Sequence, residues 1–252
     1  MQIERIDTFS GHRGPIYALE QGMEEKLFYS AGSDGWVVQW NLEKPDVGKV
    51  IAQIEGSVYA MRKEPESSIL WIGQNYEGIH GVDVGSQARI FSISLPKQAI
   101  YAIQFWGSQV WIGHDGGLIT VLDRETRQVI RHVKAGQKSV RTMCLLGTEK
   151  LAVGYSDGFI RVFNAGFELV ESWQAHQNSV FSVVYRKEDQ ALYSVGRDAH
   201  IKCYSLEDQQ EVNSIPGHIY AINDFVFSPD GFHFATASMD KTIKIWETET
   251  MQ

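Results

Sequence analysis

Short apolar segments recur along the chain at a nearly constant interval. The apolar residue that opens each unit lies 40 or 42 residues from the next, at Ile16, Val58, Ile100, Val140, Val180 and Ile222. A second ladder of large apolar or aromatic residues has spacings of 40 to 42, at Trp40, Val82, Leu122, Phe163, Tyr204 and Trp246. Two ladders that stay in step over the whole chain predict six internal repeats.

Within a repeat, apolar and polar positions alternate with the period of two that is typical of a half-buried β-strand, as in residues 159–163 and 242–246. Turn-forming segments such as residues 33–35, 156–158 and 228–231 separate these alternating stretches. We therefore expect four short strands per repeat and no helix of consequence. Repeats of about 40–45 residues with four strands are typical of the blades of a β-propeller.

Several motifs resemble the WD (tryptophan–aspartate) repeat. The last unit has the full pattern, with Gly217-His218, then Phe227-Ser228-Pro229-Asp230-Gly231, then residues 237–246 ending at Trp246. The first unit is similar, with Gly11-His12, Ser33-Asp34-Gly35 and Trp40-Asn41, and the fifth has Ala175-His176, Asp198 and Tyr204. The units centred on Val82, Leu122 and Phe163 keep the spacing but lack the His. The resemblance covers essentially the whole chain and implies a WD-repeat β-propeller.

The expected fold is all-β, with one domain over residues 1–252 that forms a propeller of six four-stranded blades. The repeats run roughly over residues 10–53, 54–95, 96–134, 135–174, 175–216 and 217–252, the last joined by residues 1–9. Residues 3–9 are predicted to form a strand that completes the last blade, because such closure removes an exposed sheet edge. Most WD propellers have seven blades, so six is the less usual number.

Three repeats carry a His, a hydroxyl residue 18 positions later, an Asp 4 further on and an aromatic residue 6 after that. The sets are His12, Ser30, Asp34, Trp40; His176, Ser194, Asp198, Tyr204; and His218, Thr236, Asp240, Trp246. A hydrolase uses such groups as base, nucleophile and orienting acid, but it needs one set at one pocket. In the other repeats the hydroxyl position is apolar, at Ile72, Ile112 and Val153, as a buried polar network requires. The resemblance implies structural tetrads, and we assign no catalytic residue and expect no enzyme.

The residue that follows each opening apolar position is a candidate for partner binding. These residues are Tyr17, Tyr59, Tyr101, Arg141, Phe181 and Asn223. By resemblance to WD propellers that hold peptides, they line the mouth of a central channel on the top face, with Arg197 and Met239 at its rim. Aromatic residues and Arg are enriched in binding hot spots. The alternative is that the tyrosines are strand-favouring residues packed between blades, and the sequence fits either interpretation.

Composition narrows the classes of partner. The net charge of −8 gives no general attraction to nucleic acid or to anionic membranes. No apolar stretch is long enough to span a membrane, and the first residues lack the apolar core of a signal peptide. Cys144 and Cys203 are too few for a disulfide framework or a zinc site, and His80, His114 and His200 lack metal-ligand spacing. We therefore expect a cytoplasmic, monomeric protein without metal or cofactor.

These features favour a scaffold or adaptor that binds peptide or protein partners. A small-molecule-binding or enzymatic propeller is the alternative, although no carboxylate lies among the channel positions. A structural subunit of a larger complex is a further alternative, which an apolar outer strand over residues 88–93 would favour. A basic run could also dock an acidic or phosphorylated peptide, or simply protect an exposed edge strand. It comprises Arg124, Arg127, Arg131, Lys134, Lys138 and Arg141.

Overall fold

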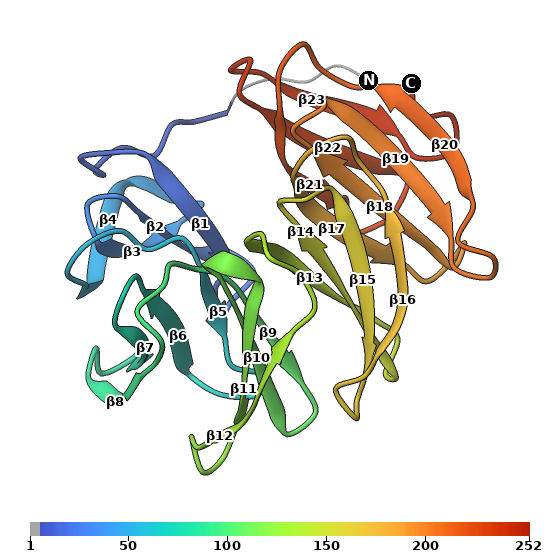
Figure 1. The fold of residues 1–252 in the computed structure, drawn as a ribbon. Coiled ribbons are helices and arrows are strands. Elements are labelled where there is room, and N and C mark those ends of the chain that lie inside the picture. The colour runs from blue at the N-terminus through green and yellow to red at the C-terminus, as the bar shows by residue number, and fades with distance from the viewer. Residues whose placement is uncertain (1–5) are drawn as a thin grey trace. The chain divides into compact units, whose positions relative to one another are not determined.

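The computed structural model describes residues 6–252, whose regular secondary structure is almost entirely β-strand (Figure 1). They form twenty-three strands and one short 3-10 turn, η1 (Asp115–Gly117). This part of the chain contains no helix long and apolar enough to cross a membrane. The predicted fold class, an all-β chain of six propeller blades, is confirmed. The chain divides into two compact units, residues 1–105 and 106–252.

The first unit contains two four-stranded antiparallel sheets. The strands of the first sheet are β1 (Ile16–Gln21), β2 (Leu27–Gly32), β3 (Trp36–Asn41) and β4 (Lys44–Gln53). Those of the second are β5 (Met61–Lys63), β6 (Ile69–Gln74), β7 (Gly78–Asp83) and β8 (Arg89–Ser94). Neighbours in sequence are neighbours in each sheet. Each sheet is therefore a simple meander, which is the topology of a propeller blade.

The same meander repeats through the rest of the chain. The third sheet contains β9 (Ile100–Trp106), β10 (Gln109–His114), β11 (Leu118–Asp123) and β12 (Val129–Lys134), and β9 spans the boundary between the units. The fourth contains β13 (Val140–Leu146), β14 (Lys150–Tyr155), β15 (Phe159–Asn164) and β16 (Leu169–Gln174). The fifth contains β17 (Val180–Arg186), β18 (Ala191–Gly196), β19 (His200–Ser205) and β20 (Glu211–Pro216). The last has three strands, β21 (Ile222–Phe227), β22 (His233–Ser238) and β23 (Ile243–Glu247).

Within each unit, the apolar core lies between consecutive sheets, and the middle strands supply most of it. In the first unit, Tyr29 on β2 and Leu70 on β6 are fully buried in one cluster. In the second unit, Trp111 on β10 and Phe163 on β15 belong to another. Burial of each such side chain stabilises the fold by roughly 1.5–3 kcal/mol. The period-two alternation is thus what turns a repeat into a blade that packs on its neighbours.

The second repeat departs from the expected strand pattern at its start. Strand β5 begins only at Met61, so Val58 and Tyr59 precede it. Val58 is nevertheless fully buried, and its N–H donates to the carbonyl of Gly32 at 3.0 Å. A hydrogen bond to the preceding sheet therefore anchors this segment before the regular ladder of its own sheet begins.

The strand predicted over residues 3–9 is not formed by its described part, since residues 6–9 have no strand structure, and its first residues lie outside the described range. Phe9 instead packs its ring on Phe28 and Trp40, with ring centroids 5.1 and 5.7 Å apart. This apolar contact, made within the first unit, fixes the chain just before the first repeat. Closure of the last sheet by residues 1–9 stays a prediction.

Candidate functional site

A β-bulge at the start of the first strand of a sheet positions four of the candidate partner-binding residues. Ile16 and Ala18 of β1 pair with consecutive residues of β2, so Tyr17 is an extra residue in the ladder. The same shift makes extra residues of Arg141 in β13, Phe181 in β17 and Asn223 in β21. A bulge bends the strand and redirects the side chain of its extra residue. The repeats thus share a local geometry that presents one side chain at the same end of each sheet.

The turn between the second and third strands lies beside each of these bulges. The N–H of Arg197 donates to the carbonyl of Ser179 at 2.9 Å, and that of Met239 donates to Ala221 at 2.9 Å. Arg197 is exposed and the Met239 side chain is 64% exposed. Both candidate rim residues therefore lie at the bulge end of their sheets with accessible side chains.

The three candidate tyrosines of the first unit form a continuous row, although only Tyr17 and Tyr101 lie in strands. The ring centroids of Tyr17 and Tyr59 are 4.7 Å apart, and those of Tyr59 and Tyr101 are 5.3 Å apart. These separations and the tilts of 50° and 40° are in the range of favourable aromatic contacts. Tyr17 is 46% exposed and the other two are half-buried. The rings contact one another, which agrees with the packing alternative, and they are also partly exposed to solvent, which binding requires.

In the second unit the candidate residues form a smaller contact. The guanidinium carbon of Arg141 lies 5.1 Å from the ring centroid of Phe181, which is the geometry of a cation–π pair. Asn223 is exposed. The planar guanidinium is thus held against an aromatic face at the bulge end of the fourth and fifth sheets.

A hollow of about 490 Å³ lies at the turn between β6 and β7, and the sequence did not indicate it. Its lining includes Gly56, Asn75, Tyr76 and Lys97. Tyr76 is 62% exposed and has φ of +67°, a left-handed conformation that non-glycine residues adopt only rarely. The side-chain oxygen of Asn75 accepts the N–H of Ile100, the residue before Tyr101, at 3.0 Å. The hollow therefore lies at the bulge end of the first unit, next to the strand that carries the last tyrosine of the row.

The His, hydroxyl and Asp residues of the first, fifth and last repeats are in direct contact. Nδ1 of the three histidines lies 2.8 to 3.0 Å from the Asp carboxylate, and Nε2 lies 2.7 to 2.9 Å from the hydroxyl. The indole N–H of Trp40 donates to Ser30 at 2.7 Å, and that of Trp246 donates to Thr236 at 2.9 Å. The His side chains are only 0 to 4% exposed and the Asp side chains 6 to 10%. These groups face one another inside each sheet, where they are almost completely buried.

The carboxylates of these sets are held in their charged form. Burial alone would raise the pKa of Asp198, but hydrogen bonds from His176 and from the N–H groups of Gln177 and His200 lower it to about 2. For Asp34, burial is likewise outweighed, here by the N–H of Arg13 and by His12, so its pKa is lowered. Each Asp therefore accepts hydrogen bonds as an anion at neutral pH.

The predicted tetrad of the fifth repeat is incomplete, because Tyr204 does not hydrogen-bond to the hydroxyl residue of its set. Its hydroxyl donates to the carbonyl of Ala175 at 2.8 Å and lies 3.3 Å from Glu211, rather than bonding to Ser194. The phenol oxygen is at the tip of the ring, further from Cβ than an indole nitrogen, so it extends past the Ser hydroxyl. The aromatic residues of the ladder therefore serve two different hydrogen-bonding roles.

The three repeats without the His at the conserved spacing contain other polar contacts, which spacing alone did not reveal. His80 contacts Ser92 at 2.8 Å and also Gln74. Nε2 of His114 is 2.9 Å from the Thr120 hydroxyl, which also lies 3.2 Å from His132. Burial lowers the pKa of His114 to about 4.

In the fourth repeat, Arg161 takes the place of the His. Its guanidinium donates to both carboxylate oxygens of Asp157, at 3.1 and 2.8 Å, and lies 4.5 Å from the ring centroid of Tyr155. The polar set is therefore replaced here rather than removed, because Asp157 still requires a partner at this turn. The sequence could have predicted this contact, since Arg161 follows Asp157 by four residues in a segment where apolar and polar residues alternate.

The remaining sequence candidates occupy peripheral positions. The basic run lies on β12, in the turn before it, in the segment before β13 and, with Arg141, at the start of β13. Arg131 is 5.7 Å from the ring centroid of Phe167. On β8, Phe91 turns inward onto Trp71, with centroids 4.8 Å apart, while Ile90 is 53% exposed. Cys203 is buried, which raises its pKa, and Cys144 is half-buried. Within residues 6–252, no group of three or more His, Cys, Asp or Glu side chains could hold a metal ion.

A family model described as "WD domain, G-beta repeat" matches residues 3–41, 167–205 and 209–247. The chain therefore contains WD repeats at these three positions. Each matched segment ends one residue after the Trp or Tyr of the first, fifth or last repeat, and these are the repeats that carry the buried His–hydroxyl–Asp sets. The WD-repeat assignment and the buried polar sets therefore point to the same three blades.

The chain is also similar to several WD-repeat relatives over nearly its full length. A striatin homolog of Dictyostelium discoideum is 22% identical and is matched by 97% of this chain over 35% of its own length. Eukaryotic translation initiation factor 3 subunit I of Bombyx mori is 22% identical, with 96% of this chain and 82% of the relative aligned. The serine-threonine kinase receptor-associated protein of Gallus gallus is 24% identical, with 96% and 69% aligned. The chain spans about a third of the length of the striatins that it matches.

Proposed function

We propose that this WD-repeat protein is a non-catalytic interaction module that binds a peptide segment of a partner protein at the bulge end of its sheets. The observation that carries the proposal is the row formed by Tyr17, Tyr59 and Tyr101, whose rings contact one another and remain partly open to solvent. Tyrosine offers a large contact area and a hydroxyl at a low cost in side-chain entropy. A row of preorganised rings therefore suits an extended peptide better than an unstructured surface does.

The second unit adds a polar preference to the proposal. Arg141 lies over the ring of Phe181, and a guanidinium is the group that pairs with a carboxylate through two hydrogen bonds. Lys138 and Arg197 are exposed at the same end of these sheets. An acidic residue in the partner segment is the feature that this end would recognise.

The proposal that the protein does not catalyse a reaction rests on the buried sets. A nucleophile must contact a substrate, whereas Ser30, Ser194 and Thr236 are no more than 1% exposed. Each hydroxyl is also within hydrogen-bond distance of a His in its own sheet. A stabilising role accounts for three separate copies, which a single active site does not.

The names of two relatives support a role in protein assemblies, since one is a subunit of a translation initiation factor and another is receptor-associated. The structural-subunit alternative gains little from β8, where Phe91 packs inward. The small-molecule alternative would place its ligand in the hollow at the turn between β6 and β7, whose lining includes Glu77 and Lys97. A cytoplasmic, monomeric protein stays our expectation.

Selection of displayed peptides tests the proposal. Wild-type protein, a variant with Tyr17, Tyr59 and Tyr101 changed to Ala, and Phe232→Ala would each be screened with one random-peptide library. Phe232 is a matched control because it is 68% exposed but lies in the turn between β21 and β22, away from the bulges. Circular dichroism and thermal melting would establish that the three proteins are folded.

A shared motif enriched by wild type and Phe232→Ala, but not by the triple variant, is the expected result. Truncation of hot-spot tyrosines typically weakens binding by about 2 kcal/mol or more each. Enrichment of the same motif by all three proteins would refute the tyrosine row as the binding site. Enrichment by none would refute peptide binding itself.

A further inference from the structure

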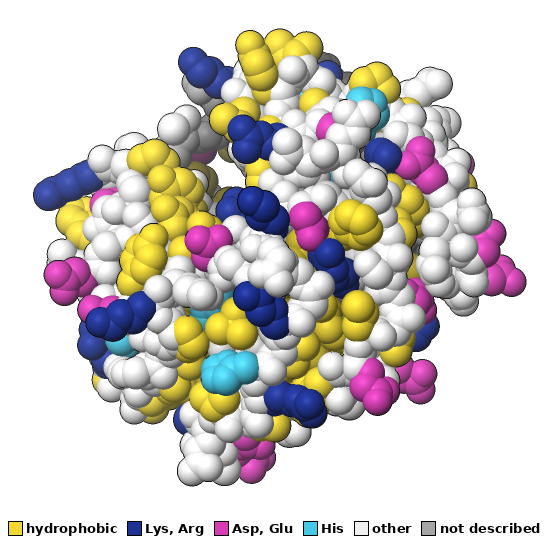
Figure 2. All heavy atoms as spheres, viewed as in Figure 1, with side chains coloured by type: hydrophobic (Ala, Val, Ile, Leu, Met, Phe, Trp, Pro, Cys, Tyr) yellow, Lys and Arg dark blue, Asp and Glu magenta, His cyan; other side chains and the backbone are white. Residues whose placement is uncertain are grey.

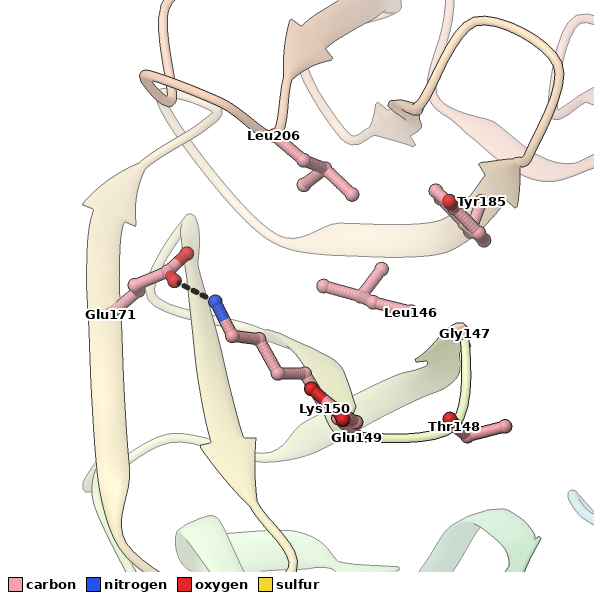
Figure 3. Close-up of a pocket in the computed structure, with 8 residues that line it drawn as sticks. All are labelled: Leu146, Gly147, Thr148, Glu149, Lys150, Glu171, Tyr185 and Leu206. Atoms are coloured by element: carbon pink, nitrogen blue, oxygen red, sulfur yellow. Dashed lines mark hydrogen bonds and ion pairs between the residues drawn. The ribbon is translucent and has the colours of Figure 1, made fainter.

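A separate pocket of about 330 Å³ opens between the fourth and fifth sheets (Figure 3). Leu146, Tyr185 and Leu206 face one another across it, and they come from the ends of β13 and β17 and from the residue after β19. The three side chains are half-buried and pack against one apolar cluster of the second unit. The floor of the pocket is thus the open end of the core between the two sheets.

The pocket lies at the end of β13 opposite to Arg141. Arg141 is the second residue of this strand and Leu146 is the last. A seven-residue strand is about 20 Å long. A ligand in the pocket would therefore not contact the bulge end of the same sheets, and this site is independent of the proposed tyrosine site.

Two contacts hold the shape of the pocket. The indole N–H of Trp106 donates to the carbonyl of Thr148 at 2.8 Å, which anchors the turn between β13 and β14. Lys150 is bonded to Glu171 at 2.6 Å, so its charge is already neutralised on one wall (Figure 3). A pocket that is preformed costs little to order when a ligand enters.

The charge around the pocket is acidic. The turns at this end of the fourth and fifth sheets, over residues 147–149, 165–168, 187–190 and 206–210, contain six acidic residues and a single lysine, Lys187. Figure 2 shows acidic side chains over the turns that follow β15 and β19. Glu149 lines the pocket and is exposed.

The opposite end of these two sheets has the reverse character. It carries Lys138, Arg141 and Arg197, while the Asp198 carboxylate there is engaged by a His and the Asp157 carboxylate by an Arg. The two ends of the same pair of sheets therefore attract partners of opposite charge.

We propose that the pocket between the fourth and fifth sheets is a second docking site, for a partner segment in which one aliphatic side chain lies next to a Lys or Arg. The aliphatic group would pack on Leu146, Tyr185 and Leu206, and the cation would pair with Glu149. The volume is at the lower limit of small-molecule sites, about 300–1,000 Å³, and suits a side chain rather than a cofactor. The protein would then join two segments, an acidic one at the bulge end and a basic one here.

The test uses two displayed libraries of seven-residue peptides. One has a central Leu with Lys at varied flanking positions, and the other has Glu in place of each Lys. The peptide that wild type enriches most would be labelled and its Kd measured by fluorescence anisotropy with Leu206→Ser, Glu149→Lys, Glu188→Lys and Tyr59→Ala. Glu188→Lys is the matched control, because Glu188 is 71% exposed in a turn at the same end but does not line the pocket.

We expect enrichment from the Lys library alone. Leu206→Ser and Glu149→Lys should each weaken binding about tenfold, which is about 1.4 kcal/mol, whereas Glu188→Lys and Tyr59→Ala should leave it within twofold. Glu149 is exposed, so its variant gives an answer even if Leu206→Ser does not fold. No enrichment, equal enrichment from the Glu library, or equal loss in Glu149→Lys and Glu188→Lys would overturn the proposal.

Discussion

Removal of the imidazole at His218 tests whether the buried polar sets stabilise the fold. Asp240 can only accept hydrogen bonds, so Nδ1 of His218 carries a proton and donates to it. With the ring proton on Nδ1, Nε2 accepts the hydroxyl proton of Thr236, and Thr236 accepts the indole N–H of Trp246. The four groups form one directed chain of hydrogen bonds. His218→Ala breaks this chain at its centre.

The cost follows from what the substitution leaves unpaired. Thr236 is 1% exposed, and its hydroxyl would lose the acceptor to which it donates in this series of hydrogen bonds. Leaving such a buried donor unpaired costs about 1–3 kcal/mol. Asp240 keeps the hydroxyl and N–H of Thr242, at 2.6 and 2.9 Å, so its loss is smaller. The His218 side chain is fully buried, so a cavity adds to the cost. We expect the free energy of unfolding to fall by about 3 kcal/mol, which lowers Tm by roughly 6–12 °C for a domain of this size.

Differential scanning calorimetry of His218→Ala beside His233→Ala would measure this. His233 lies on β22, like Thr236, but it bonds to the Ser228 hydroxyl through its own backbone N–H and carbonyl. The control should stay within about 0.5 kcal/mol of wild type. Peptide binding by folded His218→Ala at low temperature should equal that of wild type. Equal melting of His218→Ala and wild type would show that the network contributes nothing to stability.

Three further substitutions probe individual contacts. The pKa of Asp198 is lowered from 3.8 to about 2, so its charged form stabilises the fold by about 2 kcal/mol above pH 4, and this contribution is lost as pH falls toward 2. The free energies of unfolding in urea at pH 7 and at pH 3 should therefore differ less for Asp198→Asn than for wild type. Arg161→Lys should lower the free energy of unfolding by about 1–2 kcal/mol, because Lys cannot make the paired bonds to Asp157, and an unchanged denaturation midpoint would contradict this. Tyr204→Phe should lower it by about 1 kcal/mol through loss of the bond to Ala175, and a loss equal to that of His218→Ala would instead place Tyr204 inside its His network.

The sequence predicted the blades well because two strong constraints act at fixed spacing. Alternating apolar residues must face the neighbouring sheets, and buried polar groups must keep their partners. The contacts of His12 and His218 follow from the second constraint, since the same offsets recur in each repeat. The row of tyrosines also followed from repeat position, although the contact between their rings did not.

Other features depend on pairings that no spacing encodes. The bulge at Tyr17 is a property of how β1 pairs with β2, not of β1 alone. His114 contacts Thr120 on the next strand of its sheet, at an offset of 6 residues that none of the His–hydroxyl–Asp sets has. The pocket around Leu206 combines the ends of strands from two sheets. Such sites follow from the packing of whole elements, so a search by motif misses them.

The most direct test of peptide binding at the tyrosine row is NMR of protein with labelled tyrosine rings. The chain has 10 tyrosines, so single Tyr→Phe variants can assign the ring signals. Titration with the peptide selected by wild type should shift the signals of Tyr17, Tyr59 and Tyr101 and leave those of buried Tyr29 and Tyr155 unchanged. If the peptide binds and the signals of all three tyrosines of the row stay unchanged, peptide binding at the row is contradicted.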